Sequence, residues 1–120
     1  MKCICNSHLF HSMRYSLKGL RACIRNEIAF RQECILAVPH FLAVILFHLP
    51  LAIRLYLVAL WFILVAFELM NTAIESVTNL ASPSFHDLAA KAKDCASAAV
   101  FVMLILLFSS WICIIFSITK

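Results

Sequence analysis

Glycine is almost missing from this sequence: Gly19 is the only glycine in 120 residues. Nucleotide-binding loops of the Walker and dinucleotide types need several glycines in one turn, because their backbone amides must approach phosphate groups closely. The chain therefore contains no such loop. Any phosphate that it binds must be held by side chains, a helix start or a metal ion instead.

Charged residues are also scarce. They make up 13% of the sequence, whereas hydrophobic residues make up 64% and the mean hydropathy is +0.98. A soluble domain has roughly 45–50% apolar residues, so this composition predicts an integral membrane protein. The length allows one domain, residues 1–120, and no nucleic-acid partner is expected.

A cleavable signal peptide is not expected at the N-terminus. The first 33 residues carry six basic side chains and no apolar core of the required length. The predicted spans themselves are therefore expected to direct membrane insertion. The six cysteines have no framework spacing and fall in segments predicted to be cytoplasmic or membrane-buried, where disulfides are uncommon.

Residues 7–32 have the periodicity of an amphipathic helix. One apolar stripe recurs at spacings of three or four: Phe10, Met13, Leu17, Leu20, Ile24 and Ile28. A basic stripe runs beside it: Arg14, Lys18, Arg21 and Arg25. A basic amphipathic helix of modest hydrophobicity lies in the membrane interface, and we expect this one to do so.

Three apolar segments follow, and we expect each to cross the membrane as a helix. Residues 34–49 are somewhat short for the ~20 residues that a span needs, so the preceding helix must contribute a turn or the bilayer must be thin. His40 and His48 are expected as polar anchors at the far boundary. Residues 51–77 would extend ~40 Å, which requires tilt or a projecting end. Residues 96–118 form an uninterrupted apolar span.

The basic residues predict the orientation. Six lie in the first 33 residues and two more, Lys91 and Lys93, precede the last span, whereas only Arg54 and Lys120 fall on the opposite side. This asymmetry places the N-terminus in the cytoplasm. All six acidic residues lie toward the same side, so the polar chemistry is expected on the cytoplasmic face.

The stretch FELMNTAIES, residues 67–76, carries acids at the cytoplasmic end of the second predicted span. At 100° per residue, Glu68, Asn71, Glu75 and Asn79 form one polar stripe that runs from inside the membrane to the cytoplasm. Acids at membrane depth are costly and are functional by default. Oxygen ligands at the depth of a lipid headgroup suggest magnesium-assisted chemistry on a lipid, although a stripe that only bonds neighbouring helices remains an alternative.

Two further polar groups are predicted at this level. Glu27 lies in the interfacial helix, where an ion pair with Arg31 is an equally good interpretation. Lys93 and Asp94 stand at a predicted helix start, which is itself an anion site. At the N-terminus, four residues have zinc-ligand chemistry, but their spacing is too compressed for a usual structural site: Cys3, Cys5, His8 and His11.

Three motifs resemble the small integral-membrane diacylglycerol kinases of bacteria, in their Gram-negative form: SLKGLRACIRNEIAFRQE, FELMNTAIES and HDLAAKAKDCASAAV. The resemblance covers about residues 14–118. It implies an interfacial helix and three transmembrane helices in the bacterial inner membrane, a homotrimer with shared active sites, and transfer of the γ-phosphate of MgATP to diacylglycerol, which gives phosphatidic acid.

The same resemblance implies a role for each matching residue. Glu68 would be the catalytic base, and Glu27 and Glu75 would hold Mg²⁺. The ATP-binding residues would be Tyr15, Glu27, Asn71, Glu75, His86, Lys93 and Asp94. The lipid-binding residues would be Glu33, Glu68, Ser97 and Trp111.

Departures from the family pattern leave these site residues in place. Asn79 stands where the family usually has aspartate, and His8 and His11 stand near positions of permanent cations. Alternatives to diacylglycerol kinase are an undecaprenol kinase of the same family and a small membrane transporter or structural subunit. The transporter needs a polar path past Glu68, but the stretch LYLVALWFIL, residues 55–64, offers no polar residue apart from the Tyr56 hydroxyl.

Overall fold

The described part of the chain folds into four helices. The computed structural model describes the backbone of residues 3–119 and the side chains of residues 9–119. The helices are α1 (Cys3–Asn26), α2 (Ile28–Leu46), α3 (Leu51–Ala81) and α4 (Asp87–Ile118), and the described chain has no strand. The last three are long and apolar enough to cross a membrane. The prediction of an all-α membrane protein with three spans is therefore confirmed.

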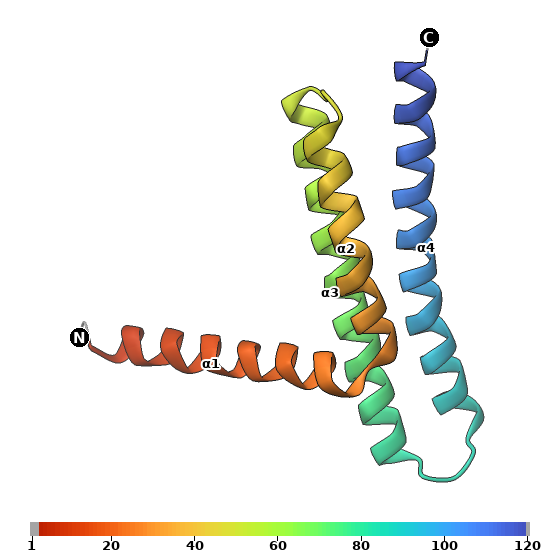
Figure 1. Ribbon diagram of the computed structural model, residues 1–120. Coiled ribbons are helices and arrows are strands. Elements are labelled where there is room, and N and C mark those ends of the chain that lie inside the picture. The colour runs from red at the N-terminus through yellow and green to blue at the C-terminus, as the bar shows by residue number, and fades with distance from the viewer. Residues whose placement is uncertain (1–2, 120) are drawn as a thin grey trace.

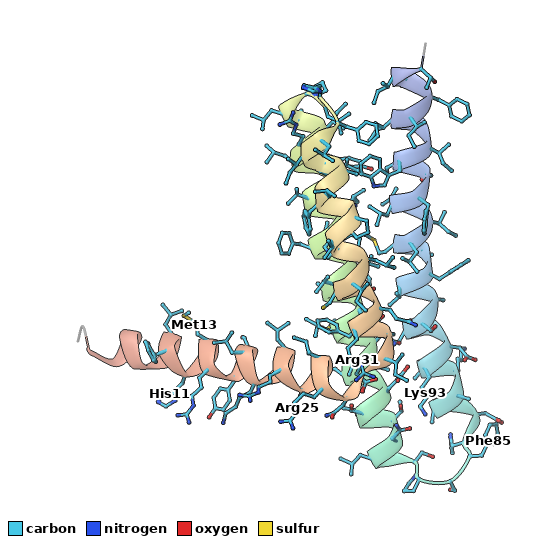
Figure 2. The ribbon with its side chains drawn as sticks, viewed as in Figure 1. His11, Met13, Arg25, Arg31, Phe85 and Lys93 are labelled. Carbon is cyan, nitrogen blue, oxygen red and sulfur yellow. The ribbon has the colours of Figure 1, made fainter. Side chains whose placement is uncertain are left out.

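The three long helices stand side by side, and α1 runs away from them to one side (Figure 1). The α3 helix packs against both α4 and α2, while α1 contacts only the ends of α2 and α3. Figure 2 shows Met13 on the side of α1 from which the spans rise, and His11 and Arg25 on the opposite side. This is the arrangement that an interfacial helix requires, with its apolar face toward the hydrocarbon.

The boundary between α1 and α2 differs from the predicted one. The helix expected over residues 7–32 is interrupted at Glu27, which has an extended backbone with φ −103° and ψ 122°. Residues 28–32 therefore form the first turns of α2, and the span expected over residues 34–49 lies at Ile28–Leu46. Its 19 residues supply the length that the predicted segment lacked. No glycine or proline marks the break, so the sequence pattern continues across it.

The other two spans are longer than predicted. The α3 helix continues past residue 77 to Ala81, and α4 begins at Asp87 instead of residue 96. No glycine or proline separates residues 87 and 96, so the short helical stretch expected before the last span is continuous with it. The turn between α3 and α4 comprises residues 82–86 and contains Pro83, the predicted helix breaker. His86 ends this turn, since its Nδ1 accepts a hydrogen bond of 3.2 Å from the backbone N–H of Leu88.

The core lies on the inner face of α3. Its larger cluster joins α3 to α4 and contains Leu60, Trp61, Leu64, Met103 and Leu107. A smaller cluster joins α3 to the end of α2 and contains Val44, Leu49 and Leu57. Lipid is as apolar as these side chains, so packing contacts rather than water exclusion hold such helices together. Most other large apolar side chains are exposed, as membrane-facing residues should be.

The interpretation of His40 as a boundary anchor is wrong. Its side chain is only 7% exposed and stacks on Trp61, with ring centroids 4.6 Å apart. The contact sits in the middle of the α2–α3 pair, two helical turns from the Glu33 level of α2. His48, in contrast, is exposed beside the turn between α2 and α3.

Candidate active site

Four acidic side chains lie in the region where α1, α2 and α3 come together. Glu68 faces inward from α3 and is 5% exposed, and Glu33 of α2 is 8% exposed. Glu75, two turns further along α3, and Glu27, in the joint between α1 and α2, both interact electrostatically with Glu68. Glu33 does so too. The fold thus places Glu27, Glu33 and Glu75 near enough to Glu68 for each of them to interact with it electrostatically.

This acidic cluster has few internal partners. Within the described part of the chain, its only side-chain hydrogen bond runs from Asn71 Nδ2 to Glu75 Oε1, at 3.2 Å. Glu33 Oε2 and Asn71 Oδ1 are buried without a partner. The ion pair between Glu27 and Arg31 that the spacing allowed does not form, and these residues are linked only through their backbones. Neighbouring carboxylates repel one another, so the cluster is suited to binding a cation or a proton.

The chemistry of the cluster suits a hard divalent cation. Carboxylate and amide oxygens are preferred by Mg²⁺, which is usually held by one or two carboxylates together with substrate phosphates. Among the described residues, no group of three or more His, Cys, Asp or Glu side chains could hold a metal by itself. The two predicted ligands, Glu27 and Glu75, would therefore need further ligands from a bound phosphate.

The electrostatics of this region reach Cys23, near the end of α1. Burial raises the pKa of the Cys23 thiol, and the carboxylates of Glu27 and Glu68 raise this pKa further. Cys23 is only 9% exposed. Like the other cysteines whose side chains are described, it forms no disulfide. The pKa of the Cys23 thiol therefore depends on the charge of both Glu27 and Glu68.

A second polar region lies at the turn between α3 and α4. A pocket of about 240 Å³ is lined by residues of both helices and of the turn, and its polar members are Thr78, Ser82, Ser84, His86, Lys93 and Asp94. Lys93 Nζ donates a hydrogen bond of 2.6 Å to Asn79 Oδ1. Three of the residues predicted to bind ATP, namely His86, Lys93 and Asp94, thus share one pocket. Lys93 lies near the lower end of the bundle in Figure 2.

An apolar pocket of about 400 Å³ opens beside the acidic cluster. Glu33 stands at one end, and Trp111 of α4 lies at the other. These two residues, both predicted on the lipid side, therefore line the same space. Most of its surface is apolar, from Leu36, Leu64, Leu104 and their neighbours.

The remaining predicted site residues are not brought into these regions within one chain. Ser97 is exposed on α4 and does not line the apolar pocket. Tyr15 is 66% exposed on α1, which packs on α2 and α3 but not on α4. The side chains of Cys3, Cys5 and His8 lie outside the described residues, so the zinc interpretation stays a prediction.

His40 is the pocket residue that sequence reasoning missed. It lines the apolar pocket together with Glu33 and Trp111. One signal was available: Glu33 and His40 are seven residues apart and so lie on the same face of a helix.

Known proteins resemble this chain over most of its length. A family model described as prokaryotic diacylglycerol kinase matches residues 14–115. A diacylglycerol kinase of Haemophilus influenzae is 37% identical over 111 residues, which cover 88% of this chain and 89% of the relative. One from Escherichia coli is 36% identical over 106 residues, and one from Pseudomonas aeruginosa is 34% identical over 103 residues. Each alignment covers 86% of this chain and 84% of the relative.

Proposed function

Because the chain belongs to the prokaryotic diacylglycerol kinase family, we propose that it transfers the γ-phosphate of MgATP to the hydroxyl of diacylglycerol, giving phosphatidic acid and ADP. Membership makes it a lipid kinase and sets aside the transporter and structural-subunit alternatives. The observation that carries the finer assignment is the acidic cluster around Glu68, which lies within a membrane span yet connects through Glu75 to the polar end of α3.

Glu68 is the proposed base. It removes the proton from the diacylglycerol hydroxyl, whose oxygen then attacks the γ-phosphorus while the bond to the β-phosphate oxygen breaks and ADP leaves. Its inward-facing position on a span suits a hydroxyl held at headgroup depth. Glu75 stands about 10 Å further toward the α3–α4 turn. This separation leaves the lipid within the membrane span and the nucleotide near the polar turn between α3 and α4.

The nucleotide is proposed to lie between the acidic cluster and the α3–α4 turn. Magnesium, held by Glu27 and Glu75, would neutralise charge on the phosphates. Lys93 adds a cation near the start of α4, where free backbone N–H groups also favour anions. Asn71 positions Glu75 through the hydrogen bond between their side chains. No glycine loop is needed in such an arrangement, in agreement with the composition.

A homotrimer is the proposed working form, with the N-terminus in the cytoplasm and the spans in the bacterial inner membrane. One chain offers open pockets and leaves Tyr15 and Ser97 away from the rest of the site. Sites shared between subunits would supply the missing walls. The excess of basic residues at the α1 end supports the orientation.

The direct test is transfer of labelled γ-phosphate from ATP to diacylglycerol in mixed micelles, with and without Mg²⁺, with undecaprenol as a competing acceptor. We expect metal-dependent labelling of phosphatidic acid. A preference for undecaprenol would keep the mechanism and change the lipid substrate. Absence of transfer to either lipid, in a protein that is folded and binds ATP, would contradict the proposal.

A further inference from the structure

His40 places a polar ring in the apolar middle of the bundle. It is stacked on Trp61, and its ring meets Trp111 edge-on at a centroid distance of 5.8 Å. Polar side chains at this depth are expensive, and they mark substrate pathways more often than structural contacts. Nothing in the mechanism proposed above uses this ring.

The hydrogen bond from Trp111 determines which nitrogen of His40 carries the proton. Trp111 Nε1 lies 3.2 Å from His40 Nδ1. An indole nitrogen can only donate, so His40 Nδ1 must be the acceptor and the neutral ring must carry its proton on Nε2. The ring therefore presents an N–H donor from Nε2.

That donor has no partner in the described structure. His40 Nε2 is buried and makes no hydrogen bond. The backbone carbonyl of Leu57 lies close enough to the ring to interact with it, but its position relative to Nε2 does not make a hydrogen bond. A buried, unpaired donor costs roughly 1–3 kcal/mol, so a ligand that accepts its proton gains correspondingly.

His40 also lines the apolar pocket that opens beside the acidic cluster. The pocket has Glu33 at its polar end, and the remainder of its wall is almost entirely apolar. Apart from Glu33, His40 is thus the polar group placed to orient an occupant. A pocket within membrane spans, with apolar walls and two buried polar groups, fits a lipid with polar atoms near its headgroup.

The depth of His40 suits the ester groups of a glycerolipid. The helices α2 and α3 are antiparallel. Glu33 interacts with Glu68, and His40, seven residues later on α2, stacks on Trp61, seven residues earlier on α3. Side chains lean toward the N-terminus of their own helix. Glu68 and His40 therefore lean toward each other, and the gap between them is smaller than the ~10 Å rise of seven residues. In diacylglycerol, ester carbonyl oxygens follow the hydroxyl after only a few bonds.

We propose that His40 donates a hydrogen bond from Nε2 to an ester carbonyl oxygen of the acceptor lipid and thereby favours acyl over alkyl glycerolipids. This inference rests on the proposed function, since it takes the hydroxyl of that lipid to be at Glu68. Trp111 acts as a positioning residue, because its indole N–H keeps Nδ1 unprotonated and Nε2 as the donor.

The test compares two acceptors of equal chain length, a 1,2-diacylglycerol and the 1,2-dialkylglycerol that lacks both carbonyls. We expect kcat/KM of the unmodified enzyme to be about fivefold higher for the diacyl lipid, mostly through KM, as one hydrogen bond would give. His40→Phe should bring this ratio close to one. His40→Gln, which keeps an N–H donor, should preserve much of it, and His48→Phe, at the exposed turn residue, should leave it unchanged.

Two outcomes separate this inference from the proposed function. An enzyme that phosphorylates neither lipid would overturn the function, and with it the inference. An enzyme that phosphorylates both lipids with equal kcat/KM, or a ratio unaltered in His40→Phe, would overturn the inference alone. If His40→Phe does not fold, infrared spectra of ¹³C-carbonyl-labelled diacylglycerol bound to the unmodified protein decide the matter. A carbonyl stretch at lower frequency than that of the same lipid in protein-free micelles supports the hydrogen bond, and an unshifted stretch contradicts it.

Discussion

Lys93 Nζ donates a 2.6 Å hydrogen bond to Asn79 Oδ1, which ties the first turns of α4 to the last turns of α3. The partner is an amide at a position where the family pattern leads one to expect a carboxylate. An amide oxygen still accepts the hydrogen bond of an ammonium group, but it does not neutralise its charge. Lys93 is thus held in the pocket at the turn while keeping its charge available for a phosphate.

Replacement of Asn79 by aspartate tests this contact. Aspartate can accept the same hydrogen bond, with added charge assistance, and would hold Lys93 more firmly. We expect kcat/KM for ATP in Asn79→Asp to be equal to that of the unmodified enzyme or up to a few-fold higher. A loss of tenfold or more would show that the site has adapted to the amide. Lys93→Met, which removes the cation, is the matched comparison and should raise KM for ATP.

Glu68→Gln should abolish turnover. The substitution keeps the size of the side chain and removes the proposed proton acceptor, and general bases commonly contribute about 10²–10⁴-fold to rate. The affinity for MgATP, measured by equilibrium binding, should remain within a few-fold. Removing one of several mutually repelling carboxylates should also leave thermal stability in detergent equal or higher. Turnover within tenfold of the unmodified enzyme would rule out the role of base.

Glu75→Gln should raise the magnesium concentration needed for half-maximal activity, because one proposed metal ligand loses its charge. Asn71 Nδ2, which donates a hydrogen bond to Glu75 Oε1, can donate equally to the amide oxygen of the introduced glutamine. The local structure should therefore persist. Ser76→Ala is the control, since the Ser76 hydroxyl bonds only to the Thr72 carbonyl. Identical magnesium titrations for Glu75→Gln and the control would remove Glu75 from the metal site.

The Cys23 thiol offers a readout of the acidic cluster that does not depend on activity. Burial and the carboxylates of Glu27 and Glu68 raise its pKa, so the reactive thiolate forms at higher pH than for an ordinary cysteine. In a variant that retains only Cys23, alkylation at pH 8 should be slower than in the same protein unfolded in detergent. Glu27→Gln should accelerate it by lowering the Cys23 pKa. Equal rates in the folded and unfolded protein would contradict the described packing of the joint.

Hydropathy and spacing were enough to predict the helical class, the three spans and the amphipathic helix before them. The ends of the helices were less predictable, because the interruption at Glu27 is made by backbone geometry alone. The electrostatic interaction of Glu68 with Glu75 followed from helical spacing, and that with Glu27 from the expected depth of Glu27. The environment of His40 could not be predicted, since Trp111 lies 71 residues away and reaches it only through tertiary packing.

The joint at Glu27 has a mechanical consequence. A single extended residue, Glu27, separates α1, which runs away from the bundle, from α2, which runs along it (Figure 1). The two helices therefore cannot move far apart from each other. Any movement of the three spans along the membrane normal would move α1 by the same distance. Changes in bilayer thickness should therefore be absorbed at the opposite end, around the turn between α2 and α3, and the acids should keep a constant distance from the water boundary.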